Sequence, residues 1–377
     1  MLGRFWATVL VCMVAGAVTL QVLGPPSPRQ GRAEGAFALA APPSLVPASP
    51  KPSSAMPARQ GQAEEPLPAP VAAAPPVQPA PPPRSAPAPV RAAEAGIPAP
   101  FAALQETVPD LPGATLPRIG PDGRMPMQVY AASFDPADKR PRVAVLLAGV
   151  GMAEVYSEEA IRATNPAISL AISPYARRPA PLLELARSTG HETLVSIPME
   201  PLGYPLNDAG TRSLLTGLPP AKNRERLLRT LSRITGYVGA TAAMSGLRGE
   251  RFGASEQMNL VLDELAARGL LYVDPRPVPL RPGNPPPARP GVRVADVFID
   301  DPPLRFDIEF KLARLEQLAR DRGSALGVAG TAGPVMVERL AAWTATLASR
   351  GVALVPVSAL VPPLLPSVSE TAASQPR

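Results

Sequence analysis

The chain has almost none of the residues that build disulfide frameworks and metal centres. Among its 377 residues there is one cysteine, Cys12, and one histidine, His191. A single cysteine excludes an intramolecular disulfide and a cysteine-rich zinc site. A single histidine excludes a metal site built on two histidines of one chain. Any Ser-His-Asp or Cys-His mechanism would have to use His191.

Aromatic residues and concentrated positive charge are also scarce. Phe, Trp and Tyr make up 4% of the chain, which is too few for a platform that stacks bases. The net charge is +6, and no dense block of lysine and arginine stands out. We therefore expect no nucleic-acid partner.

An uncharged, mainly apolar run extends from Phe5 to Gly24 and follows one basic residue, Arg4. Its length is close to that of a helix that spans a bilayer. A positive charge on the short N-terminal flank favours that flank inside the cell and the rest of the chain outside. We predict a membrane anchor over residues 1–24, with a cleaved signal peptide as the alternative.

Proline is abundant, and its excess is local. Residues 25–100 hold 22 of the 54 prolines, mixed mainly with Ala, Ser, Gln and Gly. Such a sequence cannot bury enough apolar surface to offset its ordering entropy. We predict a disordered Pro/Ala-rich linker over residues 25–140 and a disordered tail over residues 363–377.

Beyond residue 140, strand and helix patterns alternate seven or eight times. Apolar β-branched runs predict buried strands, and helical patterns that stop at glycine predict helices. No G-x-G-x-x-G opens the first helix, and no P-loop is present. We predict an α/β domain over residues 141–362 that forms a β/α barrel, regular or distorted and incomplete, rather than a doubly wound sheet. The predicted strands are 142–149, 167–173, 191–197, 237–241, 270–273, 292–298, 325–329 and 352–357, and the predicted helices are 153–164, 180–189, 223–234, 255–268, 307–322 and 335–350.

Chemistry in such a barrel takes place at the carboxyl ends of the strands. Few polar residues stand there in this sequence. His191 opens its predicted strand, at the opposite end of the barrel, so we expect a structural role for it. The acidic candidates at the carboxyl ends are Glu200, Asp274, Asp300 and Asp301.

One long stretch resembles a known family. The run SIPMEPLGYPLNDAGTRSLLTGL, residues 196–218, is similar to the long loop of the divergent polysaccharide deacetylases, which are envelope proteins related to the NodB-type deacetylases. The resemblance continues through the runs at 236–239, 269–274 and 351–360 and covers roughly residues 143–360. It implies a barrel of the glycoside hydrolase/deacetylase superfamily, a C–N hydrolase, and a divalent metal such as Zn²⁺ held by His and Asp.

The positions that the resemblance implies for metal binding and acid-base chemistry carry other residues here. Four such places are replaced in this sequence. They are an Asp pair after the first strand, a His before the Pro-Met-Glu-Pro run, an Asn-Asn-His run after the fourth strand and a Gly-His pair after the seventh. A short insertion before Arg251 follows the third of these sites. We therefore expect no metal ligands and no cofactor. The residues at the four places are Ala148 and Gly149; Ser196; Thr241, Ala242 and Ala243; and Ala329 and Gly330.

These departures predict a divergent polysaccharide deacetylase-like envelope protein, assigned to carbohydrate metabolism by resemblance, that binds a glycan or a protein without catalysis. Whether it is an enzyme stays open. One alternative is an active carbohydrate hydrolase or deacetylase that works with carboxylates, with Asp274 and Glu200 as the catalytic candidates. A second is a structural envelope tether. The predicted ligand-binding loop comprises Met199, Glu200, Tyr204, Asn207, Asp208, Arg251 and Arg276.

The anchor and the resemblance together predict the location and the partners. We expect a single-pass protein of the bacterial inner membrane with a periplasmic domain, or, if the first segment is cleaved, a protein secreted to the periplasm. The expected partners are the inner membrane through the N-terminal helix and a cell-envelope glycan or envelope protein.

Overall fold

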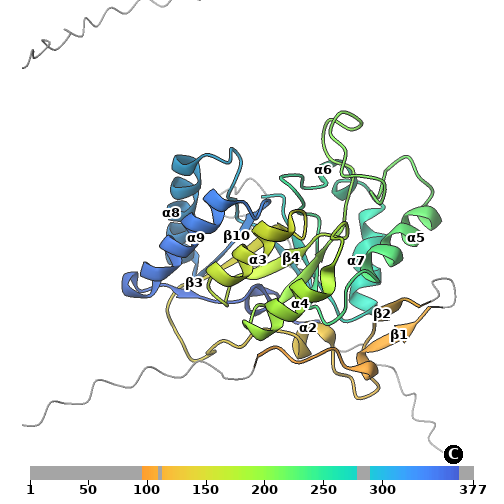
Figure 1. Cartoon of the computed structure of the whole chain (residues 1–377), viewed down its shortest axis with the longest axis horizontal. Coiled ribbons are helices and arrows are strands. Elements are labelled where there is room, and N and C mark those ends of the chain that lie inside the picture. Colours follow the sequence, from red (N-terminus) through yellow and green to blue (C-terminus); the bar gives the residue numbers. More distant parts are fainter. Residues whose placement is uncertain (1–95, 109–112, 278–288, 365–377) are drawn as a thin grey trace, which may run out of the picture. The chain divides into compact units, whose positions relative to one another are not determined.

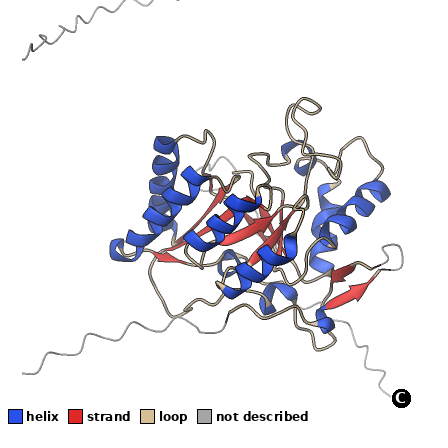
Figure 2. Ribbon diagram, in the orientation of Figure 1, coloured by secondary structure: helices blue, strands red, loops and turns tan. Residues whose placement is uncertain are grey.

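The computed structural model describes residues 96–108, 113–277 and 289–364 (Figure 1). Their main element is a curled sheet of parallel strands with helices packed around it, as Figure 2 shows. The strands are β1 (Gln105–Thr107), β2 (Thr115–Pro117), β3 (Arg142–Val150), β4 (Ser169–Ile172), β5 (Thr193–Ser196), β6 (Gly239–Thr241), β7 (Leu271–Asp274), β8 (Val292–Val294), β9 (Val297–Phe298), β10 (Ser324–Ala329) and β11 (Ala353–Leu354).

The helices follow the strands in alternation. This is the predicted β/α barrel in a distorted form. The α-helices are α2 (Pro126–Val129), α3 (Glu154–Ala163), α4 (Pro179–Ser188), α5 (Pro220–Leu231), α6 (Glu250–Gly253), α7 (Met258–Ala267), α8 (Arg305–Arg322) and α9 (Pro334–Leu347), and the 3₁₀ helices are η1 (Ala102–Leu104), η2 (Ala348–Arg350) and η3 (Val357–Leu360).

The strands of the main sheet lie in the order β8-β7-β6-β5-β4-β3-β10-β9, and β11 pairs with the beginning of β3. Every pair in this sheet is parallel. All carboxyl ends therefore lie at one end of the barrel. Alternate residues of β3 belong to two apolar clusters: Val143 and Val145 pack outward with the helices, and Ala144 and Leu146 fill the interior.

The predicted strand 292–298 is two short strands on the two edges of the curled sheet. β8 pairs with β7, and β9 pairs with β10. The two residues between them complete the ring through the backbone. The Ala295 N–H donates to the Asp274 carbonyl at 2.8 Å, and the Asp296 N–H donates to the Leu326 carbonyl at 2.8 Å. The chain thus passes from one edge to the other, and this is where the barrel departs from a regular one.

The predicted linker is wrong over residues 96–108 and 113–140, which fold onto the amino-terminal end of the barrel. β1 and β2 pair antiparallel, and the apolar side chains of this segment join the interior cluster. Leu104, Met125, Met127 and Tyr130 are each at most 7% exposed. The rest of the predicted linker, the anchor and residues 365–377 of the predicted tail lie outside the described residues.

Within the part of the chain that the structure describes, no helix combines the length and the apolar character that a membrane crossing requires. The apolar run 5–24 is not among those residues.

Candidate functional site at the barrel mouth

A tight turn covers the carboxyl end of the barrel. Met244 and Leu247 exchange two backbone hydrogen bonds of 3.0 and 2.9 Å, which leaves Ser245 and Gly246 as a two-residue loop. Both have positive φ, 49° and 81°, as such a loop requires.

The turn lies directly on the strand ends where the family resemblance implies metal ligands. A Cβ atom built on Gly330 would come within 2.8 Å of the Gly246 Cα and 2.9 Å of the Phe298 ring. A Cβ atom on Gly149 would come within 3.0 Å of the Gly330 carbonyl oxygen. Arg248 lies over the Phe298 ring at 4.7 Å and adds a further layer. Backbone and an aromatic ring therefore fill the space at positions 149 and 330.

A small cavity of about 140 Å³ remains beside the turn. Its polar side chains are hydroxyl groups, those of Tyr156, Ser157, Ser245 and Thr331. It holds no carboxylate and no imidazole. Hydroxyl groups alone do not make the anionic or imidazole ligand set that divalent zinc takes in proteins.

Glu200, a predicted catalytic residue, is a buried anchor of the long loop. Its Oε2 accepts hydrogen bonds from the Thr216 N–H at 2.6 Å and the Thr216 hydroxyl at 2.7 Å. Its Oε1 lies 3.0 Å from the Arg251 Nε. Its backbone carbonyl accepts from the N–H groups of Arg251 and Phe252, so one residue joins the loop to the start of α6.

The other acidic candidates are also bound within the protein. Asp274 forms an ion pair with Arg276 at 2.6 Å and accepts the Arg276 backbone N–H at 3.0 Å, and this pairing raises the pKa of the Arg276 guanidinium. Asp300 accepts from the Gly330 N–H and from both the N–H and the hydroxyl of Thr331. Asp301 pairs with Arg248 at 3.0 Å.

The carboxylates therefore do not converge on one point. Across residues 96–108, 113–277 and 289–364, no group of three or more His, Cys, Asp or Glu side chains is placed to hold a metal ion. Ser196, at the position implied for a histidine, donates to the Ala243 carbonyl at 2.8 Å. The residues present at the mouth do not fit a divalent cation.

The predicted ligand-binding loop divides into a buried base and an exposed tip. Met199 is 1% exposed and pairs with Leu214, so it belongs to the base with Glu200. Tyr204, Asn207 and Asp208 lie in the tip, where Asn207 donates to the Leu202 carbonyl and Asp208 accepts the Gly210 N–H. Arg251 lies beside Glu200, whereas Arg276 lies against Gly253 and Asp274.

The loop tip belongs to an apolar rim that the sequence interpretation missed. Nine of the eleven exposed large apolar side chains in the described residues come from segments that follow the carboxyl ends of β3, β5, β9 or β10. The sequence signal for this rim is the presence of apolar residues on the outer face of the first turns of α3 and α8. A surface helix that packs only inward would carry polar residues at those positions. The rim residues are Met152, Val155, Tyr156, Leu202, Leu206, Leu304, Phe306, Phe310 and Val335.

His191 lies at the other end of the barrel, as predicted, and is buried. Its Nδ1 is 2.8 Å from the Ile168 carbonyl, and its Nε2 is 2.9 Å from the Ile161 carbonyl. Burial lowers the pKa of the imidazole and outweighs the two backbone hydrogen bonds that raise it.

Comparison with known proteins identifies the family. The sequence profile described as divergent polysaccharide deacetylase matches residues 145–361. An uncharacterized protein from Agrobacterium tumefaciens, known from its crystal structure, is 32% identical, with a TM-score of 0.59 and coverage of 66% of this chain and 100% of that chain. The chain belongs to the divergent polysaccharide deacetylase family.

Two further crystal structures are more distant. A Mycobacterium smegmatis protein assigned provisionally as a polysaccharide deacetylase is 14% identical, with a TM-score of 0.37 over 61% of this chain and 92% of that one. An Enterococcus faecalis protein assigned provisionally to cellobiose-phosphate cleavage is 10% identical, with a TM-score of 0.41 over 59% of this chain and 99% of that one. Curated proteins gave no match to the chain.

Proposed function

We propose that this divergent polysaccharide deacetylase is a non-catalytic binding domain of the cell envelope. In this proposal the barrel keeps the architecture of the family and holds a partner on the outer surface of its mouth. Two features support the absence of catalysis. The turn 244–247 occupies the mouth, and Glu200, Asp274 and Asp300 are each engaged by donors of the same chain.

The observation that carries the binding role is the apolar rim. Monomeric proteins expose large apolar groups singly, whereas a gathering of them at one end marks an interaction surface. Leu206 at the loop tip is 96% exposed, and Phe306 at the start of α8 is 77% exposed. The tip is preorganised by its own hydrogen bonds and by Glu200, which reduces the entropy lost on binding.

The chemistry of the rim favours a protein partner over a glycan. Eight of the nine rim side chains are Leu, Val, Met or Phe, which supply apolar contact area without the hydrogen-bonding groups that sugar hydroxyls need. We propose that the partner is another envelope protein. We also propose that residues 1–24 hold the domain at the periplasmic face of the bacterial inner membrane, because an apolar run of membrane-spanning length follows Arg4.

Site-specific photocrosslinking in cells tests the proposal. A photoreactive residue is placed at Leu206 or Phe306 of the full chain, and at Phe134, an exposed apolar residue outside the rim, as the matched control. We expect one discrete crosslinked protein from both rim positions and none from position 134. Crosslinks of equal yield from position 134, or none from the rim, would overturn the binding role. Release of acetate from N-acetylglucosamine oligomers above the buffer rate would overturn the absence of catalysis.

A further inference from the structure

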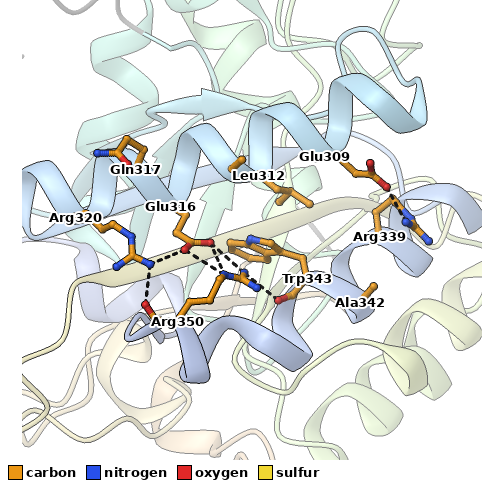
Figure 3. A pocket seen from close by; sticks show the side chains of 10 residues that line it. Glu309, Leu312, Glu316, Gln317, Arg320, Arg339, Ala342, Trp343 and Arg350 are labelled. Atoms are coloured by element: carbon orange, nitrogen blue, oxygen red, sulfur yellow. Dashed lines mark hydrogen bonds and ion pairs between the residues drawn. The ribbon is translucent and has the colours of Figure 1, made fainter.

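A cleft between α8 and α9 lies on the outer helical layer (Figure 3). Its volume is about 480 Å³, which is within the range of pockets that hold small ligands. One wall is a single face of α8, on which Glu309, Leu312, Glu316 and Arg320 follow one another at helical spacing. The facing wall comes from α9 and η2.

The two ion-paired groups of the cleft are arranged in opposite ways. Glu309 is 49% exposed and pairs with Arg339, which is 13% exposed, whereas around Glu316 the carboxylate is inside and the guanidinium groups are outside. Glu316 binds Arg320 at 2.6 Å and Arg350 at 3.0 Å. The Glu316 side chain is 13% exposed, whereas those of Arg320 and Arg350 are 37% and 36% exposed. Burial raises the pKa of Glu316. The hydrogen bonds from Arg350 and Arg320 together lower this pKa by more than burial raises it, so the pKa lies below its usual value. At the Glu316 end of the cleft, an approaching ligand therefore meets positive charge first.

The second feature is an apolar wall with unsatisfied donors. Trp343 packs against the hydrophobic core and, with Leu312 and Ala342, lines the cleft. Five buried side-chain polar atoms in the described residues have no hydrogen-bond partner. Two of them, Arg339 Nε and Trp343 Nε1, belong to this wall. Both are N–H donors, so the acceptor that each one lacks would be an oxygen.

We propose that this cleft binds an oligosaccharide whose sugars carry a carboxylate. The guanidinium groups of Arg320 and Arg350 suit a carboxylate, and the apolar wall suits the non-polar face of a sugar ring. The alternation of Glu and Arg along the cleft offers both acceptors and donors to ring hydroxyls. An acidic peptide supplies the carboxylate but not this array of hydroxyl groups. The inference does not depend on the binding role of the rim.

The chain itself supplies a probe for the test. It contains two tryptophans, Trp6 and Trp343. In the full chain carrying Trp6→Phe, indole fluorescence reports the cleft alone. The probe ligand is trigalacturonate, and the comparison ligands are neutral triacetylchitotriose and hexaglutamate.

We expect trigalacturonate to change the fluorescence saturably, with an affinity that falls as salt is added. Arg350→Gln and Arg320→Gln should each weaken binding about tenfold, because each removes a charge-assisted contact. Arg178→Gln is the matched control, since Arg178 also pairs with a glutamate but does not line the cleft, and it should leave the affinity unchanged.

Three outcomes would overturn the proposal. The first is the absence of a saturable signal up to about 10 mM trigalacturonate, which corresponds to a binding free energy weaker than roughly −3 kcal/mol. The second is equal affinity for triacetylchitotriose, which would remove the role of the carboxylate. The third is equal affinity for hexaglutamate, which would remove the role of the sugar.

Discussion

Replacement of Glu200 distinguishes an anchoring role from a catalytic one. The carboxylate accepts two hydrogen bonds from Thr216 and pairs with Arg251, whose side chain is 57% exposed. A hydrogen bond to a charged group contributes about 1.5–3 kcal/mol, and an exposed ion pair contributes about 0–1 kcal/mol. Because the Thr216 hydroxyl can rotate toward another acceptor, we expect Glu200→Ala to lower the free energy of unfolding by about 3 kcal/mol.

Glu200→Gln keeps one amide oxygen facing Thr216 and loses mainly the pairing with Arg251, so we expect a loss of about 1 kcal/mol. In a domain of this size about 3 kcal/mol corresponds to a fall in Tm of roughly 6–12 °C. The measurement is thermal unfolding followed by circular dichroism at 222 nm. Asp208→Ala is the matched control, because this loop carboxylate is exposed and accepts only the Gly210 N–H in the structure.

The anchoring role would be refuted by a particular pattern. If Glu200→Ala and Glu200→Gln both unfolded at the temperature of the unmodified protein while both abolished an activity on acetylated sugars, Glu200 would be catalytic. If Asp208→Ala lowered Tm as much as Glu200→Ala, the hydrogen bonds to Thr216 would not be the cause.

Three further predictions concern buried residues of the domain. Glu192 is fully buried and accepts one hydrogen bond each from Ser169 and Ala132 and two from Ser358. Glu192→Ala should therefore lower the free energy of unfolding, measured in urea, by about 3–5 kcal/mol. A loss below about 1 kcal/mol would contradict a stabilising role of these hydrogen bonds. Gly330→Ala should lower the free energy of unfolding by about 1–3 kcal/mol, because the new Cβ atom meets the turn at Gly246. Gly333→Ala is the control and should be neutral, because nothing lies within 4 Å of its Cβ position. Equal Tm values for the two variants would contradict the conclusion that the turn covers the barrel mouth. The pKa of His191 is lowered in the folded state, so the unfolded chain takes up a proton at a higher pH than the folded protein does. The free energy of unfolding should therefore decrease as the pH is lowered past about 6.5, by at most about 1.4 kcal/mol per pH unit. His191 is the only histidine, and His191→Gln should remove this slope between about pH 5.5 and 7; a slope that persists would point to other groups.

The strand and helix pattern of the barrel was predictable because its strands are buried on both sides. The run over Arg142–Val150 is continuously apolar after its first residue, as a two-sided buried strand requires. The glycine that ends α8, Gly323, has φ of 84° and closes the helix as predicted. Residues 292–298 were harder, because the change of partner strand at Ala295 and Asp296 depends on contacts with β7 and β10 that are distant in sequence.

The segment 96–140 was missed because composition averages over long windows. The apolar residues of this segment that are buried, among them Leu104 and Tyr130, stand apart from one another among prolines and polar residues. At the candidate site, the sequence correctly placed the acidic residues near strand ends, but not their partners. That Glu200 meets Thr216 and Asp300 meets Thr331 follows from the folding of loops, and no local pattern encodes it.

Metal affinity of the barrel tests the central proposal most directly. The full chain is stripped with a chelator and titrated with Zn²⁺ by calorimetry. We expect no site with a Kd below about 1 mM, because the mouth offers backbone, hydroxyl groups and an aromatic ring where ligands would be required. One site of micromolar affinity, accompanied by release of acetate from N-acetylglucosamine oligomers, would contradict the proposal and show that this barrel is an enzyme.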